Sequence, residues 1–215
     1  MTRIKICGIV EIEHAMAAAR LGADYVGLVF APSRRQVSLA IAREIIAAVK
    51  KVKPRQEFAG VFVNSPSRTV NNTAEKCGLD WIQLSGDEPW QYCRDMARPF
   101  IKVIHVLPGK TADMILSDIE TGYRLNFKQR FVCLLDSKED KAYGGTGKSF
   151  DWKIAVEVAA RYPVIIAGGL TPDNAGRLVR GVKPWGVDVS SGVEVNGVKS
   201  IEKIQAFIKE VRSTG

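Results

Sequence analysis

The stretch "RIKICGIVEIEHAMAAARLGADYVGLVF" at residues 3–30 contains the strand–helix–strand unit from which the fold is predicted. Residues 3–7 alternate in the manner of a strand, and 24–30 form a second run rich in apolar residues. Between them, residues 11–21 are good helix formers, and the helical pattern stops at Gly22, which is a helix C-cap signal. A strand, a crossing helix and a second strand form a βαβ unit with the two strands parallel.

The same alternation continues along the whole chain. Further strands are expected at 57–62, 80–84, 100–105, 131–135, 163–167 and 185–188. Further helices are expected at 38–51, 66–77, 89–97, 110–120, 151–161, 172–181 and 199–212. Eight such units in 215 residues leave about 27 residues per unit, which suits a compact (βα)8, or TIM, barrel.

A doubly wound open sheet is the alternative α/β architecture. It is disfavoured because no G-x-G-x-x-G follows the first strand and the chain shows no division into two unequal halves. Residues 1–215 are therefore predicted to form a single (βα)8-barrel domain, with room for few insertions.

Composition and charge limit the classes of function that the chain can have. Hydrophobic residues make up 46% and charged residues 25% of the chain, an ordinary globular balance. No apolar run is long enough for a membrane span, and a charged strand at Arg3 takes the place of a signal segment, so a cytoplasmic protein is expected. The net charge of +8 favours an anionic partner. A nucleic-acid-binding module is disfavoured because basic and aromatic residues are scattered rather than clustered; a phosphorylated small molecule fits better.

The cysteines and histidines do not form a metal or disulfide pattern. The four cysteines, at 7, 77, 93 and 133, are far apart and lack C-x-x-C pairs or nearby histidines, which excludes a zinc motif and a convincing disulfide framework. The two histidines, His14 and His105, are more typical of structural positions.

Glycine-rich turns follow the last three predicted strands. Gly168-Gly169 follows strand seven, Ser190-Ser191-Gly192 follows strand eight, and Gly145 lies in a glycine-rich loop after strand six. Glycines allow close approach of the backbone to an anion, and the loops after strands seven and eight are the common phosphate site of barrels. The three turns together favour phosphate binding over simple tight turns.

Other strand ends carry reactive or charged side chains. Cys7 ends strand one, where a buried hydrophobe is the alternative to a catalytic thiol. Asp136 follows "FVCLL" and is either a helix N-terminal partner or a catalytic carboxyl in a partly desolvated mouth. Arg34 and Arg35 are solvated loop charges or ligands for a carboxylate.

In their order along the chain, these motifs resemble the phosphoribosylanthranilate isomerase family. The matching stretches are "KICGI" (5–9), "GADYVGLVF" (22–30), "SRRQVS" (33–38), "GVFVN" (60–64), "QLSGDE" (83–88), "LLDS" (134–137), "YGGTGKSFDW" (143–152), "AGGLTPDN" (167–174) and "VDVSSGVE" (187–194). The resemblance covers the whole length of the chain.

The resemblance implies a cofactor-free, metal-free (βα)8 enzyme of tryptophan biosynthesis that performs an Amadori rearrangement of N-(5-phosphoribosyl)anthranilate. By position, Cys7 matches the family's base, Asp136 its general acid and Arg35 its anthranilate-binding arginine. One position departs from the family pattern: Ser85 stands where the family carries histidine. The sequence leaves open whether the enzyme is a monomer or a homodimer.

The nearest rival is the decarboxylating cyclase of the same pathway, which is also a phosphate-binding barrel. Its chemistry requires a lysine acid and further carboxylates at strand ends. Lys5 and Lys102 lie within predicted strands, so no lysine stands out for that role.

Overall fold

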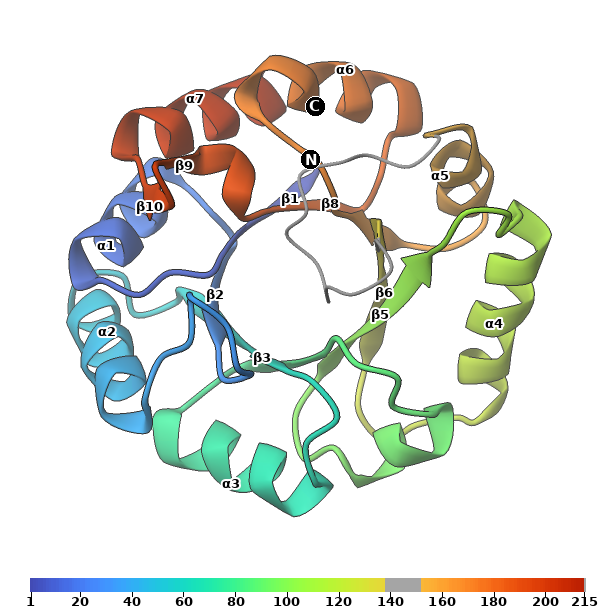
Figure 1. Cartoon of the computed structure of the whole chain (residues 1–215), viewed down its shortest axis with the longest axis horizontal. Helices are drawn as coiled ribbons and strands as arrows, with labels where there is room; N and C mark the ends of the chain where they lie inside the picture. The colour runs from blue at the N-terminus through green and yellow to red at the C-terminus, as the bar shows by residue number, and fades with distance from the viewer. Residues whose placement is uncertain (138–151, 215) are drawn as a thin grey trace.

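The eight parallel strands of this chain close into one barrel. A computed structural model describes residues 1–137 and 152–214. Strands β1 to β8 follow one another around the ring, and β8 pairs with β1 to complete it. Figure 1 looks down this ring and shows the helices on its outside. The (βα)8 prediction is confirmed, and the open-sheet alternative is wrong.

The element boundaries agree closely with those expected from the sequence. The barrel strands are β1 (Arg3–Cys7), β2 (Tyr25–Val29), β3 (Glu57–Phe62), β4 (Trp81–Leu84), β5 (Phe100–Val106), β6 (Phe131–Ser137), β7 (Val164–Ile166) and β8 (Gly186–Val189). The α-helices are α1 (Ile12–Leu21), α2 (Leu39–Val52), α3 (Ser67–Cys77), α4 (Ala112–Arg124), α5 (Trp152–Ala159), α6 (Pro172–Val182) and α7 (Ile201–Arg212). None of the helices in the described ranges has the length and apolar character needed to cross a bilayer.

Two elements differ from the sequence expectation. The helix expected at 89–97 is a short 3-10 helix, η1 (Trp90–Asp95). After β8 the chain forms a second 3-10 helix, η2 (Ser191–Val193), and then a small hairpin of β9 (Glu194–Val195) and β10 (Val198–Lys199). Asn196 and Gly197 join the hairpin strands, both with positive φ, as a two-residue type I′ turn requires.

Alternation along each strand divides the core into two parts. Outward-facing residues such as Ile4, Ile6 and Val187 pack beneath the helices in one large cluster. Inward-facing residues such as Tyr25 and Trp81 form a second cluster inside the barrel. Successive strand side chains point to opposite faces, so each strand must be apolar on both. The barrel is therefore filled by side chains, and its chemistry is confined to the strand ends.

A buried ion pair joins the first and last strands. Lys5 and Asp188 are register partners of β1 and β8, and the Lys5 Nζ atom lies 3.0 Å from Asp188 Oδ1. Their side chains are only 1% and 9% exposed. Charges so deeply buried must be paired, because an isolated one would lose its hydration without compensation. The pair therefore holds the register at the seam that closes the barrel.

We expect Lys5→Met to lower the free energy of unfolding at pH 7 by about 3–5 kcal/mol, the cost of leaving one buried charge without its partner. Urea unfolding monitored by tryptophan fluorescence measures it. The double variant Lys5→Met/Asp188→Leu removes both charges and should recover most of the loss. A single variant as stable as the wild type would show that the seam does not depend on this pair.

Candidate active site

Cys7 and Asp136 both lie at the carboxyl ends of barrel strands, around the Lys5–Asp188 pair. Cys7 is the last residue of β1 and is buried, and Asp136 is the sixth residue of β6 and is half-buried. Lys5 and Asp188 each act electrostatically on both groups. Three strands, β1, β6 and β8, thus contribute to one electrostatically coupled group at the mouth of the barrel.

The Asp136 carboxyl is close to half-protonated at neutral pH. Burial raises its pKa to about 7, and the negative charge of Asp188 adds to the increase. Lys5 and the backbone N–H of Ser137 act in the opposite direction but do not outweigh burial. A carboxyl with this pKa is well suited to donate a proton at physiological pH.

The Cys7 thiol is held mainly in its neutral form. Burial raises its pKa, and Asp188 raises it further, while the charge and hydrogen bond of Lys5 lower it. The N–H of Gly8, the residue after Cys7, donates to the carbonyl oxygen of Gly27, at 3.0 Å. Because the ladder between β1 and β2 continues through Gly8, this N–H does not stabilise a Cys7 thiolate. Lys5 is the cation that favours the thiolate.

The loops after β7 and β8 are in direct contact. A methyl group on Gly192 would overlap the carbonyl oxygen of Leu170, so only glycine allows the two loops to meet. Gly168 and Gly169 adopt positive φ values of 88° and 65°, a conformation that favours glycine. A side chain on Gly168 would overlap the Ser137 hydroxyl. The loop after β7 therefore lies against the end of β6, where Asp136 is found.

These loops present backbone donors together. Within the described ranges, the N–H groups of Gly169, Ser191 and Gly192 donate to no protein acceptor. Ser191 and Gly192 open η2, and Gly169 precedes α6. Unpaired N–H groups at helix starts attract anions. Gly145, the other expected phosphate ligand, lies outside the described residues.

Arg35 reaches from the loop after β2 to the hairpin after β8. Its aliphatic chain passes directly over Gly8, where a side chain would collide with it. Its Nε and Nη2 atoms donate to the two oxygens of Glu194, at 2.7 and 3.0 Å. Arg34 and Lys199 also pair with Glu194, at 2.6 and 2.7 Å. Glu194 thus holds three cations at the ends of β1 and β8.

Burial alone would raise the pKa of Glu194, but the hydrogen bonds from Arg35 and Lys199 outweigh it and hold the pKa below its ordinary value. The carboxylate is therefore charged at neutral pH. One negative charge among three cations leaves an excess of positive charge at this edge of the mouth, which suits an anionic substrate.

Four residues of the site were not singled out from the sequence: Lys5, Asp188, Glu194 and Lys199. The sequence does contain features that could have identified them. Lys5 shares its strand face with Cys7. Asp188 and Glu194 lie within the stretch "DVSSGVE", and Lys199 follows the Asn196-Gly197 turn.

Position 85 keeps an imidazole as its neighbour, although serine replaces the expected histidine. His105 on β5 places its Nε2 atom 3.1 Å from the carbonyl oxygen of Ser85. Because that oxygen can only accept, Nε2 carries the proton. The Ser85 hydroxyl is buried and accepts from the side chain of Gln83 at 3.0 Å.

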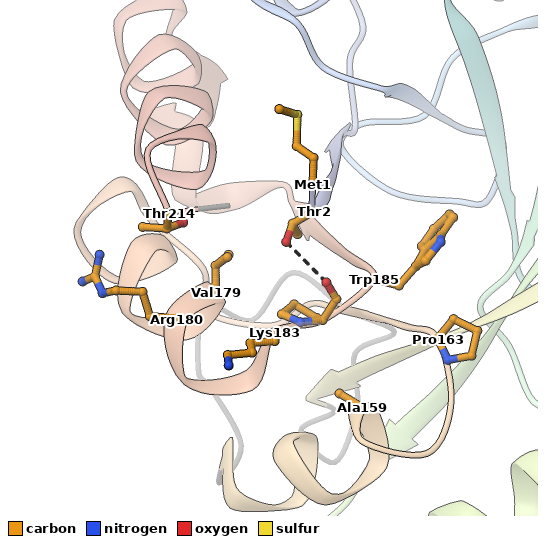
Figure 2. Close-up of a pocket in the computed structure, with 10 residues that line it drawn as sticks. Met1, Thr2, Ala159, Pro163, Val179, Arg180, Lys183, Trp185 and Thr214 are labelled. Atoms are coloured by element: carbon orange, nitrogen blue, oxygen red, sulfur yellow. Dashed lines mark hydrogen bonds between the residues drawn. The ribbon is translucent and has the colours of Figure 1, made fainter.

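A cavity of about 650 Å³ lies at the other end of the barrel. Figure 2 shows Met1 and Thr2, which precede β1, together with Lys183 and Trp185, which precede β8. Among the described residues, its lining includes Arg180 and Lys183 but no Asp or Glu side chain. Barrel enzymes carry their catalytic groups at the carboxyl ends of the strands, so the mouth around Cys7 and Asp136 is the candidate active site.

Comparisons with known proteins agree with this geometry. The sequence profile of the N-(5'-phosphoribosyl)anthranilate isomerase family matches residues 4–210. The chain belongs to the N-(5'-phosphoribosyl)anthranilate isomerase family. A relative from Dehalococcoides mccartyi with that name is 45% identical over 212 residues, 99% of this chain and 96% of the relative. The rival interpretation as the decarboxylating cyclase is therefore wrong.

Solved structures of phosphoribosylanthranilate isomerases share the fold. The Thermotoga maritima enzyme superposes with a TM-score of 0.85 and 36% identity, covering 99% of this chain and all of that one. Another Thermotoga maritima structure describes monomers generated from the dimeric enzyme, with a TM-score of 0.81, 34% identity and the same coverage. A third isomerase, in complex with reduced 1-(o-carboxyphenylamino)-1-deoxyribulose 5-phosphate, gives a TM-score of 0.82 at 33% identity, again covering 99% and 100%. This chain is thus an isomerase of tryptophan biosynthesis.

The raised pKa of Asp136 predicts a pH-dependent stability. In the folded isomerase the pKa is about 7, whereas an unfolded aspartate titrates near 3.9. The folded state therefore holds a proton that the unfolded state releases, and stability falls as pH rises from about 4 to about 7. Asp136→Asn lacks this loss, so its stability relative to wild type should rise by up to about 4 kcal/mol over that range.

Urea unfolding at pH 4.5 and pH 8 measures the difference. Asp113→Asn, at an exposed position in the first turn of α4, is the control for removing a negative charge and should show no comparable change. A stability difference between Asp136→Asn and wild type that is equal at both pH values would contradict the assignment.

Proposed function

We propose that this chain isomerises N-(5-phosphoribosyl)anthranilate to 1-(2-carboxyphenylamino)-1-deoxyribulose 5-phosphate, with Asp136 as the general acid and Cys7 as the base. The observation that carries the proposal is the half-buried Asp136 carboxyl at the barrel mouth, with its pKa of about 7. An ordinary aspartate would have lost its proton at this pH, whereas Asp136 retains one to donate.

The rearrangement needs two proton transfers. The acid protonates the furanose ring oxygen, the bond between that oxygen and C1′ breaks, and a Schiff base forms to the anthranilate nitrogen. The base then removes the proton from C2′, which gives an enolamine. The enolamine tautomerises to the ketone, and the acid and base regain their starting states when protons return to the carboxylate and leave the thiol.

The electrostatics of the mouth support this division of roles. In its active form Asp136 is protonated while Cys7 is ionised, so the pair together carries one proton. Lys5 favours the Cys7 thiolate by its charge and its hydrogen bond. The charge of Asp188 favours protonated Asp136. The buried Lys5–Asp188 pair thus acts on both members.

The substrate's two anionic ends have separate subsites. We assign the phosphate to the backbone of Gly168, Gly169, Ser190, Ser191 and Gly192, with Gly145 completing the site from the loop after β6. The unpaired N–H groups of Ser191 and Gly192 at the start of η2, and of Gly169 in the loop before α6, support this assignment. Arg35 is assigned to the anthranilate carboxylate, since a guanidinium can form two parallel hydrogen bonds to a carboxylate.

The remaining expectations concern assembly and location. We assign the whole chain, 1–215, to one catalytic domain that takes a small phosphorylated substrate. Because the Thermotoga maritima relative occurs as a dimer and as generated monomers, both a monomer and a homodimer remain compatible with this chain. The cytoplasmic location stays a prediction.

The acid–base pair predicts a bell-shaped pH dependence of kcat/KM. Because Asp136 has a pKa of about 7, the rising limb should have its midpoint near that pH, and the falling limb should lie above the ordinary pKa of a thiol. Both values belong to the coupled pair rather than to single residues. Stopped-flow or fluorescence assays with freshly prepared substrate measure the profile.

Replacement of either group should abolish most of the turnover. Cys7→Ala and Asp136→Asn should each lower kcat by at least about 10²–10⁴-fold, the contribution of general acid–base catalysis. Inhibition by inorganic phosphate should persist in both, because the phosphate loops are intact. Near-normal turnover of Cys7→Ala would make Cys7 a buried hydrophobe without a role in the chemistry.

Arg35→Ala tests the carboxylate subsite. Loss of a hydrogen bond to a charged group should weaken transition-state binding by about 1.5–3 kcal/mol, measured as a fall in kcat/KM. N-(5-phosphoribosyl)aniline, which lacks the carboxyl group, should react equally poorly with wild type and variant. Unequal reaction of wild type and Arg35→Ala with the aniline analogue would point to Arg34 as the ligand or to a purely structural role for Arg35.

A further inference from the structure

A hairpin that the catalytic chemistry does not use carries the most highly connected charged cluster of the mouth. Glu194 and Lys199 are cross-strand partners of β9 and β10. Their Oε1 and Nζ atoms lie 2.7 Å apart, and the side chains are 4% and 2% exposed. Burying an ion pair so completely has a desolvation cost that a well-packed apolar pair would avoid. The presence of this buried pair points to a role beyond stabilising the hairpin.

The Glu194 carboxylate is saturated with donors. Oε1 accepts from Arg35 Nε and Lys199 Nζ, and Oε2 accepts from Arg34 Nη2 and Arg35 Nη2. The two bonds to Arg35 grip one edge of its guanidinium, a geometry that fixes both the position and the plane of the group. Among the described residues, Arg35 Nη1 has no acceptor, so part of the guanidinium remains for a ligand.

Lys199 continues the connection to the phosphate loop. Its Nζ atom donates to the carbonyl oxygen of Ser190 at 2.9 Å and reaches the Ser190 hydroxyl at 3.3 Å. That hydroxyl in turn donates to the carbonyl oxygen of Cys7 at 3.1 Å. One chain of polar contacts therefore runs from Arg35 through Glu194, Lys199 and Ser190 to the end of β1.

We propose that Glu194 and Lys199 are positioning residues that hold the carboxylate-binding Arg35 and the phosphate loop at Ser190 in one fixed spatial relation. The proposal rests on the proposed function, because it takes Arg35 as the carboxylate ligand. The substrate carries a carboxylate at one end and a phosphate at the other, so both anchors must be preorganised for the sugar between them to reach Cys7 and Asp136. The hairpin supplies that preorganisation.

The opposite possibility is that Glu194 occupies the place of the substrate's carboxylate and must be displaced before binding. The two roles predict opposite effects of Glu194→Gln. A positioning residue, when neutralised, weakens selection for the carboxylated substrate. A displaceable occupant, when neutralised, frees Arg35 and strengthens selection for the carboxylated substrate.

The test measures the preference of each variant, defined as kcat/KM for phosphoribosylanthranilate divided by that for N-(5-phosphoribosyl)aniline. Glu194→Gln should reduce the preference at least about tenfold, the effect of one charge-assisted hydrogen bond. Arg34→Ala is the matched control: its side chain is 57% exposed and pairs with the same carboxylate. It should change the preference less than about fivefold, the limit for an exposed ion pair.

Lys199→Met provides an independent arm that also decides the question if Glu194→Gln does not fold. It should raise the inhibition constant of inorganic phosphate, because Ser190 loses its anchor. It should also lower the preference, because the Glu194 oxygen that accepts from Arg35 Nε loses the Lys199 ammonium that holds it in place. A purely structural hairpin would lower both rates by the same factor and leave the preference unchanged. An unchanged or increased preference in the folded variants would overturn the proposal.

Failure of the proposed function would give different results from failure of the positioning role. If wild type converts neither compound, or if Arg35→Ala keeps the full preference, the assigned reaction or the role of Arg35 is wrong. If wild type and Arg35→Ala behave as expected and Glu194→Gln still prefers the carboxylated substrate as wild type does, only the positioning role of the hairpin fails.

Discussion

The buried ion pair between Lys5 and Asp188 is the interaction on which both the barrel and its mouth depend. It joins residues 183 positions apart in the chain and holds the seam between β1 and β8. A lysine with 1% of its side chain exposed tolerates burial only because its partner is fixed opposite it. The same two charges then act on Cys7 and Asp136. Barrel closure and the protonation of Cys7 and Asp136 are therefore coupled.

The ionisable residues at the mouth form two groups that differ in protonation state. Around Cys7 and Asp136, burial dominates and favours the neutral forms of both groups. Around Glu194, hydrogen bonds from cations dominate and keep the carboxylate ionised. The first arrangement keeps Asp136 able to exchange a proton near neutral pH and holds Cys7 mainly as the thiol. The second provides a fixed charge that orients other side chains. Both are built from carboxylates, and their surroundings determine which role each can fill.

Much of the architecture can be predicted from the sequence, because it depends on interactions between residues that are close together in the chain. The strand alternation depends only on neighbours in the chain, as at Ile4, Lys5 and Ile6. The helix stop signal at Gly22 is equally local. Repeating that unit eight times leaves few folds to choose from. The hairpin after β8 was missed although Asn196-Gly197 is a strong turn signal, because its strands are only two residues long. The segment at 89–97, expected to be an α-helix, forms the shorter 3-10 helix η1.

Patterns local to the sequence predict the order of strands and helices, the glycine turns after β7 and β8, and the placement of Cys7 and Asp136 at strand ends. The charges that surround those residues depend on how the barrel closes. Asp188 comes to lie beside Lys5, Glu194 binds Arg35, and Gly27 takes the N–H of Gly8, all through contacts between different strands or loops. A pKa depends on burial and on nearby charges in space. Periodicity can assign a residue to one face of a strand, but it cannot show what the closed barrel places across from it.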